Sequence, residues 1–105
     1  GCAQSIWLPY FSKYLGFDVT GIDYSETGCH MARQALADQD ATGTIVCADV
    51  FEANEVAEGA FDAVFTNGFV EHFHDVGGVV KVLARYLKPR GLVVTIGRTG
   101  IPESR

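Results

Sequence analysis

The sequence predicts an α/β fold, with a parallel β-sheet that carries helices on both faces. Short β-prone runs alternate with helix-length segments along the chain, and three of these runs end on polar residues. Strands separated by helical segments form βαβ units, whose strands are parallel and whose helices cover the sheet. The 105 residues are enough for one small domain, and 48% hydrophobic with 20% charged residues is ordinary for a globular core.

Two helices and two strands are expected in the first half of the chain. Residues 5–16 form the first helix, because their large apolar side chains fall on one stripe and a glycine ends it. Residues 17–23 form a strand that ends on an aspartate. Ser25 is a suitable N-cap for the second helix, although Gly28 weakens that helix. Residues 44–49 form the second strand.

One helix and two strands are expected in the second half. Residues 61–66 form a strand, and residues 92–96 form another. Between them, a Pro-Gly turn at residues 88–91 is expected to end a helix. The apolar stripe of that helix consists of Val79, Val80, Leu83 and Leu87.

Polar residues stand where three of the predicted strands end. Two strands end on Asp23 and Asp49, and a third runs into Asn67-Gly68. In open parallel sheets, ligands bind at the carboxyl ends of the strands, near the point where the strand order reverses. The sequence therefore predicts a site for a nucleotide-like ligand at this edge.

Charge and cysteine content exclude several classes of protein. The net charge of −5 without a Lys/Arg cluster argues against a nucleic-acid partner, because phosphate binding needs concentrated positive charge. No apolar run approaches the about 20 residues that a membrane helix needs, so no membrane partner is expected. Three cysteines without a CxxC spacing suggest neither a disulfide framework nor a zinc site. A cytoplasmic location is predicted.

Five stretches in order along the chain resemble one family. They are GCAQS, VTGIDYSETG, CADVFE, FDAVFTNGFVEHFHD and LARYLKPRGLVVT. Together they resemble the class I S-adenosylmethionine-dependent methyltransferases, in particular the small methyltransferase type 11 or 12 domains. The resemblance implies a Rossmann-like sheet, with a strand before Gly1 and further strands after the last predicted one. Residues 1–105 are therefore expected to be a partial S-adenosylmethionine-binding domain that lacks its first strand and its C-terminal strands.

The resemblance assigns the adenosine half of the methyl donor to two strand ends. Asp23 would bind the ribose hydroxyls, with Tyr24 following it towards the adenine edge. Asp49 would accept a hydrogen bond from the exocyclic amine of adenine, while the N–H of Val50 donates to a ring nitrogen. The competing interpretations are a helix cap for Asp23, simple packing for Tyr24 and a plain turn for Asp49.

The amino-acid half of the donor is assigned to backbone groups. Gly1 and Ala3 would bring amides near it, in a loop that reads Gly1, Ala3, Ser5 where the family usually has GxGxG. Asn67 and Gly68 would place a backbone carbonyl near the donor's ammonium. Both residues are also common turn formers, which is the alternative.

The stretch from Glu71 to Asp75 is the one segment where reactive side chains crowd. The resemblance places its Glu-His pair at the rim of the donor pocket, so His72 is the candidate general base for an acceptor oxygen or nitrogen. A structural hydrogen bond at a helix start is the alternative. A zinc or iron site would need at least one more ligand, and His30 is the only other histidine, so no metal is expected.

The resulting prediction is methyl transfer from S-adenosylmethionine to an unidentified acceptor, preferably a small molecule. In-line displacement at the sulfonium depends on holding the reacting atoms in line, and it needs no metal. One alternative is an NAD-dependent oxidoreductase, although the loop lacks GxGxxG because Ile6 stands three residues after Ala3. Another is a non-catalytic module that binds the donor.

Overall fold

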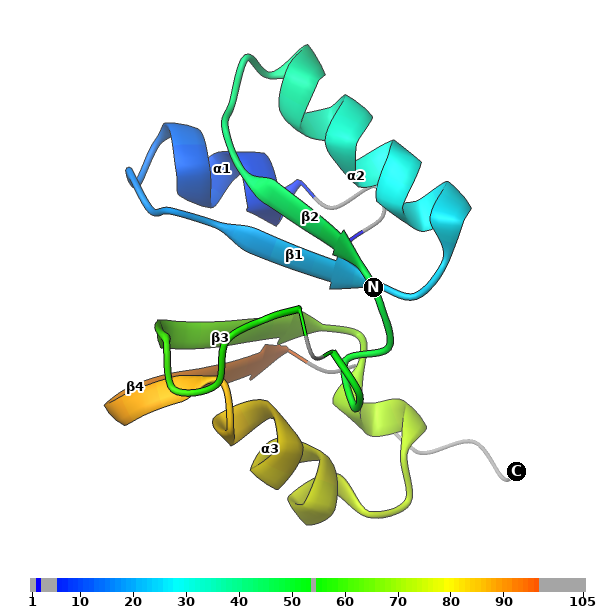
Figure 1. Cartoon of the computed structure of the whole chain (residues 1–105), viewed down its shortest axis with the longest axis vertical. Coiled ribbons are helices and arrows are strands. Elements are labelled where there is room, and N and C mark those ends of the chain that lie inside the picture. Colours follow the sequence, from blue (N-terminus) through cyan, green and yellow to red (C-terminus); the bar gives the residue numbers. More distant parts are fainter. Residues whose placement is uncertain (1, 3–5, 54, 97–105) are drawn as a thin grey trace. The chain divides into compact units, whose positions relative to one another are not determined.

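The computed structural model describes residue 2, residues 6–53 and residues 55–96. They fall into two compact units, the first unit spanning Gly1–Val56 and the second unit spanning Ala57–Arg105. In the described residues, each unit contains two parallel strands and at least one α-helix (Figure 1). The predicted α/β class with parallel strands is confirmed. Helices on both faces of one sheet stay a prediction, since each unit is described by itself.

The first unit follows the predicted order of helix, strand, helix and strand. Strands β1 and β2 pair in parallel, with Thr20 opposite Thr44 at one end and Asp23 opposite Cys47 at the other. Both strands are shorter than their β-prone runs. The elements are α1 (Trp7–Lys13), β1 (Thr20–Asp23), α2 (Glu26–Asp38) and β2 (Thr44–Cys47).

Local signals in the sequence account for the start of α2. The Ser25 side chain accepts a hydrogen bond from the N–H of Gly28 at 3.2 Å, which confirms the predicted N-cap. Glu26 in the first turn is favourable for the helix dipole. Gly28 lies inside the helix despite its low propensity, so a tertiary reason for it is needed.

The core of the first unit lies between α2 and the sheet. Cys29, Ala32 and Leu36 of α2 pack on Ile45 of β2, and Leu8 of α1 packs against the same cluster. Gly21 of β1 faces this cluster, because a Cβ added there would lie 3.3 Å from the Leu8 side chain and 3.0 Å from that of Ile45. Both helices therefore cover the same face of the β1–β2 sheet, as Figure 1 shows.

The second unit is built on another parallel pair. Helix α3 begins at an Asp75 cap, whose carboxylate accepts the N–H of Gly78 at 2.9 Å. Val79 and Leu83 on α3, and Tyr86 just after it, are buried. The elements are β3 (Phe61–Asn67), the short 3₁₀-helix η1 (Val70–His72), α3 (Val76–Ala84) and β4 (Leu87–Ile96).

Two expectations for the second unit are wrong. Helix α3 ends at Ala84, and Leu87 already pairs with Phe61 on β3 rather than continuing the helical stripe. The Pro-Gly segment does not end the helix either; it lies within β4, where the register shifts and Arg90 has a φ of 69°. The reason is that the N–H groups of residues 59–61 bond to the carbonyls of residues 85 and 86, so strand pairing begins directly after the helix.

Candidate functional site

Asp23 lies at the carboxyl end of β1, and its carboxylate is held by backbone groups on both sides. One oxygen accepts the N–H of Cys2 at 3.1 Å and the other accepts the N–H of Ser25 at 3.0 Å. The residue is 6% exposed. Because a carboxylate can accept about four hydrogen bonds, these bonds fix its orientation without by themselves precluding a ligand.

Tyr24 follows directly and is 82% exposed, so simple packing does not account for its position. Its backbone lies where β1 meets α2, in the short connection that Ser25 caps. An exposed aromatic ring at the carboxyl end of a strand can stack on a flat ligand.

Gly28 contributes to the candidate site, although the sequence predicted only that it weakens the helix. A Cβ built on it would lie 2.7 Å from one carboxylate oxygen of Asp23 and 2.9 Å from the other. Glycine is therefore required at this point of α2 for the Asp23 carboxylate to occupy its position. The feature of the sequence that could have revealed this role is a glycine placed three residues after the N-cap, inside a helix.

Asp49 lies in the loop after β2, and this loop is tied to the end of β1. The N–H of Ala48 donates to the carbonyl of Asp23 at 2.9 Å. The Asp49 carboxylate accepts the N–H of Phe51 at 2.9 Å, as a turn aspartate does, and the residue is exposed. Val50, next to it, is half-buried. Asp23, Tyr24 and the 48–50 loop thus lie together at one edge of the first unit.

In the second unit, β3 ends at Asn67, and Gly68 follows it directly. Gly68 has a φ of 69°, its N–H donates to the carbonyl of Ile96 at 2.7 Å, and a Cβ there would meet nothing within 4 Å. Glycine is preferred at this point for its backbone conformation rather than for space. Gly1 and Ala3, the other residues predicted to bind the amino-acid tail, lie outside the described residues.

His72 is the last residue of η1, five residues after the end of β3. Its backbone N–H donates to the carbonyl of Phe69 at 3.2 Å, and its side chain is exposed. The rings of Phe69 and Phe73 lie 5.0 Å apart and flank it in sequence. An exposed imidazole in this position is accessible to an acceptor molecule.

The family model described as a methyltransferase domain matches residues 1–95. The chain belongs to the methyltransferase domain family. This membership confirms the resemblance predicted from the sequence. The family and its O-methyltransferase relatives imply S-adenosylmethionine as methyl donor.

Curated relatives of this methyltransferase domain are O-methyltransferases. A ubiquinone biosynthesis O-methyltransferase of Caulobacter vibrioides is 36% identical over 101 residues, covering 94% of this chain and 40% of the relative. A malonyl-[acyl-carrier protein] O-methyltransferase of Pseudescherichia vulneris is 33% identical over 105 residues, covering 98% of this chain and 39% of the relative. The chain thus spans about 40% of the length of these relatives.

Solved structures share the fold. The crystal structure of the PH0226 protein from Pyrococcus horikoshii OT3 matches with a TM-score of 0.67 and 26% identity, covering 79% of this chain and 40% of that one. The [4+2]-cyclase SpnF matches with a TM-score of 0.61 and 22% identity, covering 73% of this chain and 30% of that one. The second likeness shows the fold alone.

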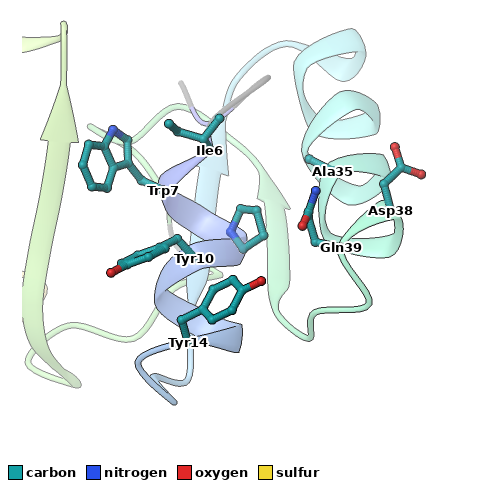
Figure 2. Close-up of a pocket in the computed structure, with 8 residues that line it drawn as sticks. Ile6, Trp7, Tyr10, Tyr14, Ala35, Asp38 and Gln39 are labelled. Atoms are coloured by element: carbon teal, nitrogen blue, oxygen red, sulfur yellow. The ribbon is translucent and has the colours of Figure 1, made fainter.

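A groove of about 670 Å³ between α1 and α2 of this methyltransferase domain is a separate feature (Figure 2). The α2 residues that line it lie at the end of that helix, whereas Asp23 precedes the helix. The groove therefore does not coincide with the edge where the predicted donor-binding residues of the first unit lie. Its lining consists of Ile6, Trp7, Pro9, Tyr10, Tyr14, Ala35, Asp38 and Gln39.

The described part of this methyltransferase domain contains neither a candidate metal cluster nor a helix able to span a membrane. Over residues 6–53, residues 55–96 and Cys2, no group of three or more His, Cys, Asp or Glu side chains is arranged to hold a metal ion. In the same part of the chain, none of the helices has the length and apolar character needed to span a membrane.

Proposed function

We propose that the protein to which this chain belongs transfers a methyl group from S-adenosylmethionine to an oxygen atom of a small-molecule acceptor. The family match over residues 1–95 carries this proposal. Relatives named for ubiquinone biosynthesis and for malonyl-[acyl-carrier protein] are both O-methyltransferases, which supports oxygen as the accepting atom.

In this proposal, the first unit holds the adenosine half of the donor. Asp23 binds the ribose hydroxyls, Tyr24 stacks at the adenine edge, and Asp49 with the N–H of Val50 recognises the adenine ring. The joint position of these residues at one edge of the β1–β2 sheet supports the assignment. The two backbone N–H groups on the Asp23 carboxylate give it a fixed orientation before a ligand arrives.

The amino-acid half of the donor is assigned to Gly1 and Ala3 and to the backbone of Asn67 and Gly68. The donor supplies an activated methyl group, and the protein holds the nucleophile, the methyl carbon and the sulfur in line. His72 takes the proton from an acceptor hydroxyl as the methyl group is transferred. Its exposed side chain supports this role.

The fold alone does not select this reaction, because one fold hosts several chemistries. SpnF, with the same fold, is named as a [4+2]-cyclase. The family match and the O-methyltransferase relatives favour methyl transfer over the NAD-dependent alternative and over a non-catalytic module.

The proposal is tested by calorimetric titration of S-adenosylhomocysteine into the full-length protein, with NAD as a second ligand. We expect micromolar binding of S-adenosylhomocysteine and none of NAD. Asp23→Ala removes the ribose contact and should abolish binding, whereas Asp18→Ala, the same change at an exposed position of the first unit, should leave it unchanged.

A second variant separates binding from folding. Asp23→Ala also removes the acceptor for two backbone N–H groups, so circular dichroism and thermal unfolding accompany it. Tyr24→Ala changes a side chain that is 82% exposed, so it should weaken S-adenosylhomocysteine binding while the unfolding temperature stays unchanged. A folded protein that binds NAD, or neither ligand, contradicts the proposal.

We also propose a cytoplasmic location. The three cysteines are free, and two of them, Cys2 and Cys29, are at least partly buried. Unpaired cysteines are typical of proteins kept in a reducing compartment.

A further inference from the structure

Three cysteines that are far apart in the sequence converge on the carboxyl end of β1. The N–H of Cys2 donates to the Asp23 carboxylate, and the Cys29 thiol donates to the carbonyl of Asp23 at 3.2 Å. The Cys47 thiol lies 3.9 Å from the carbonyl of Tyr24. All three are free thiols, and none of them has a role in the proposed methyl transfer.

Cys29 and Cys47 face each other across the interface of α2 with the sheet. Ile45 packs in the same cluster as Cys29, and side chains two residues apart on a strand point to the same face, so Cys47 points towards α2. The Cys29 thiol also lies 3.9 Å from the carbonyl of Val46. The carbonyls that the two thiols approach belong to the consecutive residues Asp23 and Tyr24, which brings the two side chains to the same point at the end of β1.

The two thiols differ in reactivity. Cys47 is exposed, whereas Cys29 is 1% exposed. Burial, followed by the contact with Cys47, raises the pKa of Cys29 to about 11. Since the thiolate is the nucleophile, an oxidant from solution reaches and oxidises Cys47 first.

We propose that Cys29 and Cys47 form an intramolecular disulfide when the protein is exposed to a peroxide, and that this disulfide weakens binding of the methyl donor. First, the Cys47 sulfur attacks a peroxide oxygen; with hydrogen peroxide the O–O bond breaks, giving a sulfenic acid and water. Next, the Cys29 sulfur attacks the Cys47 sulfur; the S–S bond forms, the S–O bond breaks, and the Cys29 proton leaves with the hydroxyl as water. Two thiols are oxidised by two electrons in total, and one peroxide is reduced to two water molecules.

The coupling to donor binding rests on the function proposed above. The disulfide removes both S–H groups, which contact the carbonyls of Asp23 and Tyr24. It also requires the two sulfurs to approach each other to an S–S length of about 2.05 Å. This movement draws the first turn of α2, where Gly28 faces the Asp23 carboxylate, towards the end of β2, where Cys47 pairs with Asp23.

The disulfide is tested by treating the reduced full-length protein with hydrogen peroxide and mapping its peptides by mass spectrometry without reductant. We expect one new link, between Cys29 and Cys47, that a thiol reductant reverses. Cys2→Ser should give the same link. Cys29→Ala, which suits the apolar surroundings of this side chain, should stop the reaction at a Cys47 sulfenic acid that dimedone labels. A link that involves Cys2 or joins two molecules, or a wild-type protein that only accumulates oxidised Cys47, overturns the proposal.

The coupling is tested by titrating S-adenosylhomocysteine into the oxidised and the reduced protein. We expect weaker binding to the oxidised form, restored by reductant, and no effect of peroxide treatment on Cys47→Ser. Equal affinities would overturn the coupling while the mapped disulfide stands. Binding to neither form would instead refute the proposed function, and the peptide map would remain valid by itself.

Discussion

Gly28 shows how one absent side chain shapes the candidate site. Glycine inside a helix is less favourable than alanine by about 1 kcal/mol, yet α2 has it directly beside the Asp23 carboxylate. A Cβ at this position would lie 2.7 Å from a carboxylate oxygen that a backbone N–H already holds. Gly28 therefore lowers the helix propensity of α2, but it leaves the space that the Asp23 carboxylate occupies.

We expect Gly28→Ala to weaken S-adenosylhomocysteine binding to the full-length protein. The added methyl group displaces the Asp23 carboxylate, and overpacking of this kind costs about 1–3 kcal/mol of unfolding free energy. Calorimetric titration and urea unfolding measure the two effects. Gly77→Ala in α3 is the matched control, because its Cβ would meet its nearest atom only at 3.8 Å. That variant should gain about 0.4–1 kcal/mol and bind unchanged. Unchanged binding by Gly28→Ala would show that Asp23 needs no such room.

Helix α2 begins where the sequence predicted, because its start is encoded locally by the Ser25 cap. Its side chain satisfies the N–H of Gly28, which would otherwise lack a partner within the helix. The N–H of Ser25 donates to the Asp23 carboxylate, and the Cys29 thiol in the first turn donates to the Asp23 carbonyl, so the start of α2 positions the candidate site.

Ser25→Ala should lower the free energy of unfolding of the full-length protein by about 1 kcal/mol, the usual cost of losing such a cap. Urea unfolding measures this change. Thr27→Ala, at an exposed position in the first turn of the same helix, should cause no such loss. If both variants unfold alike, the cap does not stabilise α2.

Elements with local signals were predicted well, and those set by long-range pairing were not. The strand-end position of Asp23 and the cap at Ser25 could be inferred from a few neighbouring residues. The end of α3 could not, because backbone bonds to residues 59–61 redirect the chain into β4 before the Pro-Gly segment. For the same reason, the convergence of Cys29 and Cys47 has no signature in their sequence spacing.

Over the length of the chain, the order of the elements was more informative than any single motif. The glycine loop departs from GxGxG, and each of the five family-like stretches is short, yet the family match extends over residues 1–95. Asp23, Asp49 and Asn67 were predicted as candidate donor-binding residues because they stand at strand ends, which the chain order determines. Gly28 was missed as a site residue, because its contact with Asp23 depends on how α2 packs beside β1.

The proposed mechanism gives Asp23 and His72 different tasks. Donor binding by the first unit depends on Asp23, whereas proton removal depends on His72 in the second unit. Variants of the two residues should therefore change different constants. His72→Gln keeps a polar side chain but cannot act as a base, so we expect kcat to fall by about 10²–10⁴-fold while the affinity for S-adenosylhomocysteine stays the same.

Transfer of a labelled methyl group to phenolic acceptors, which keep their hydroxyl proton at neutral pH, measures kcat with the full-length protein. His74→Gln is the matched control, because it is the same change at an exposed histidine two residues away. Equal losses in the two variants would indicate a local structural effect rather than proton removal. Full activity of His72→Gln would mean that the acceptor loses its proton without this side chain. In either case an unchanged affinity for S-adenosylhomocysteine would leave the role of Asp23 unaffected, since Asp23 and His72 contribute to separate steps.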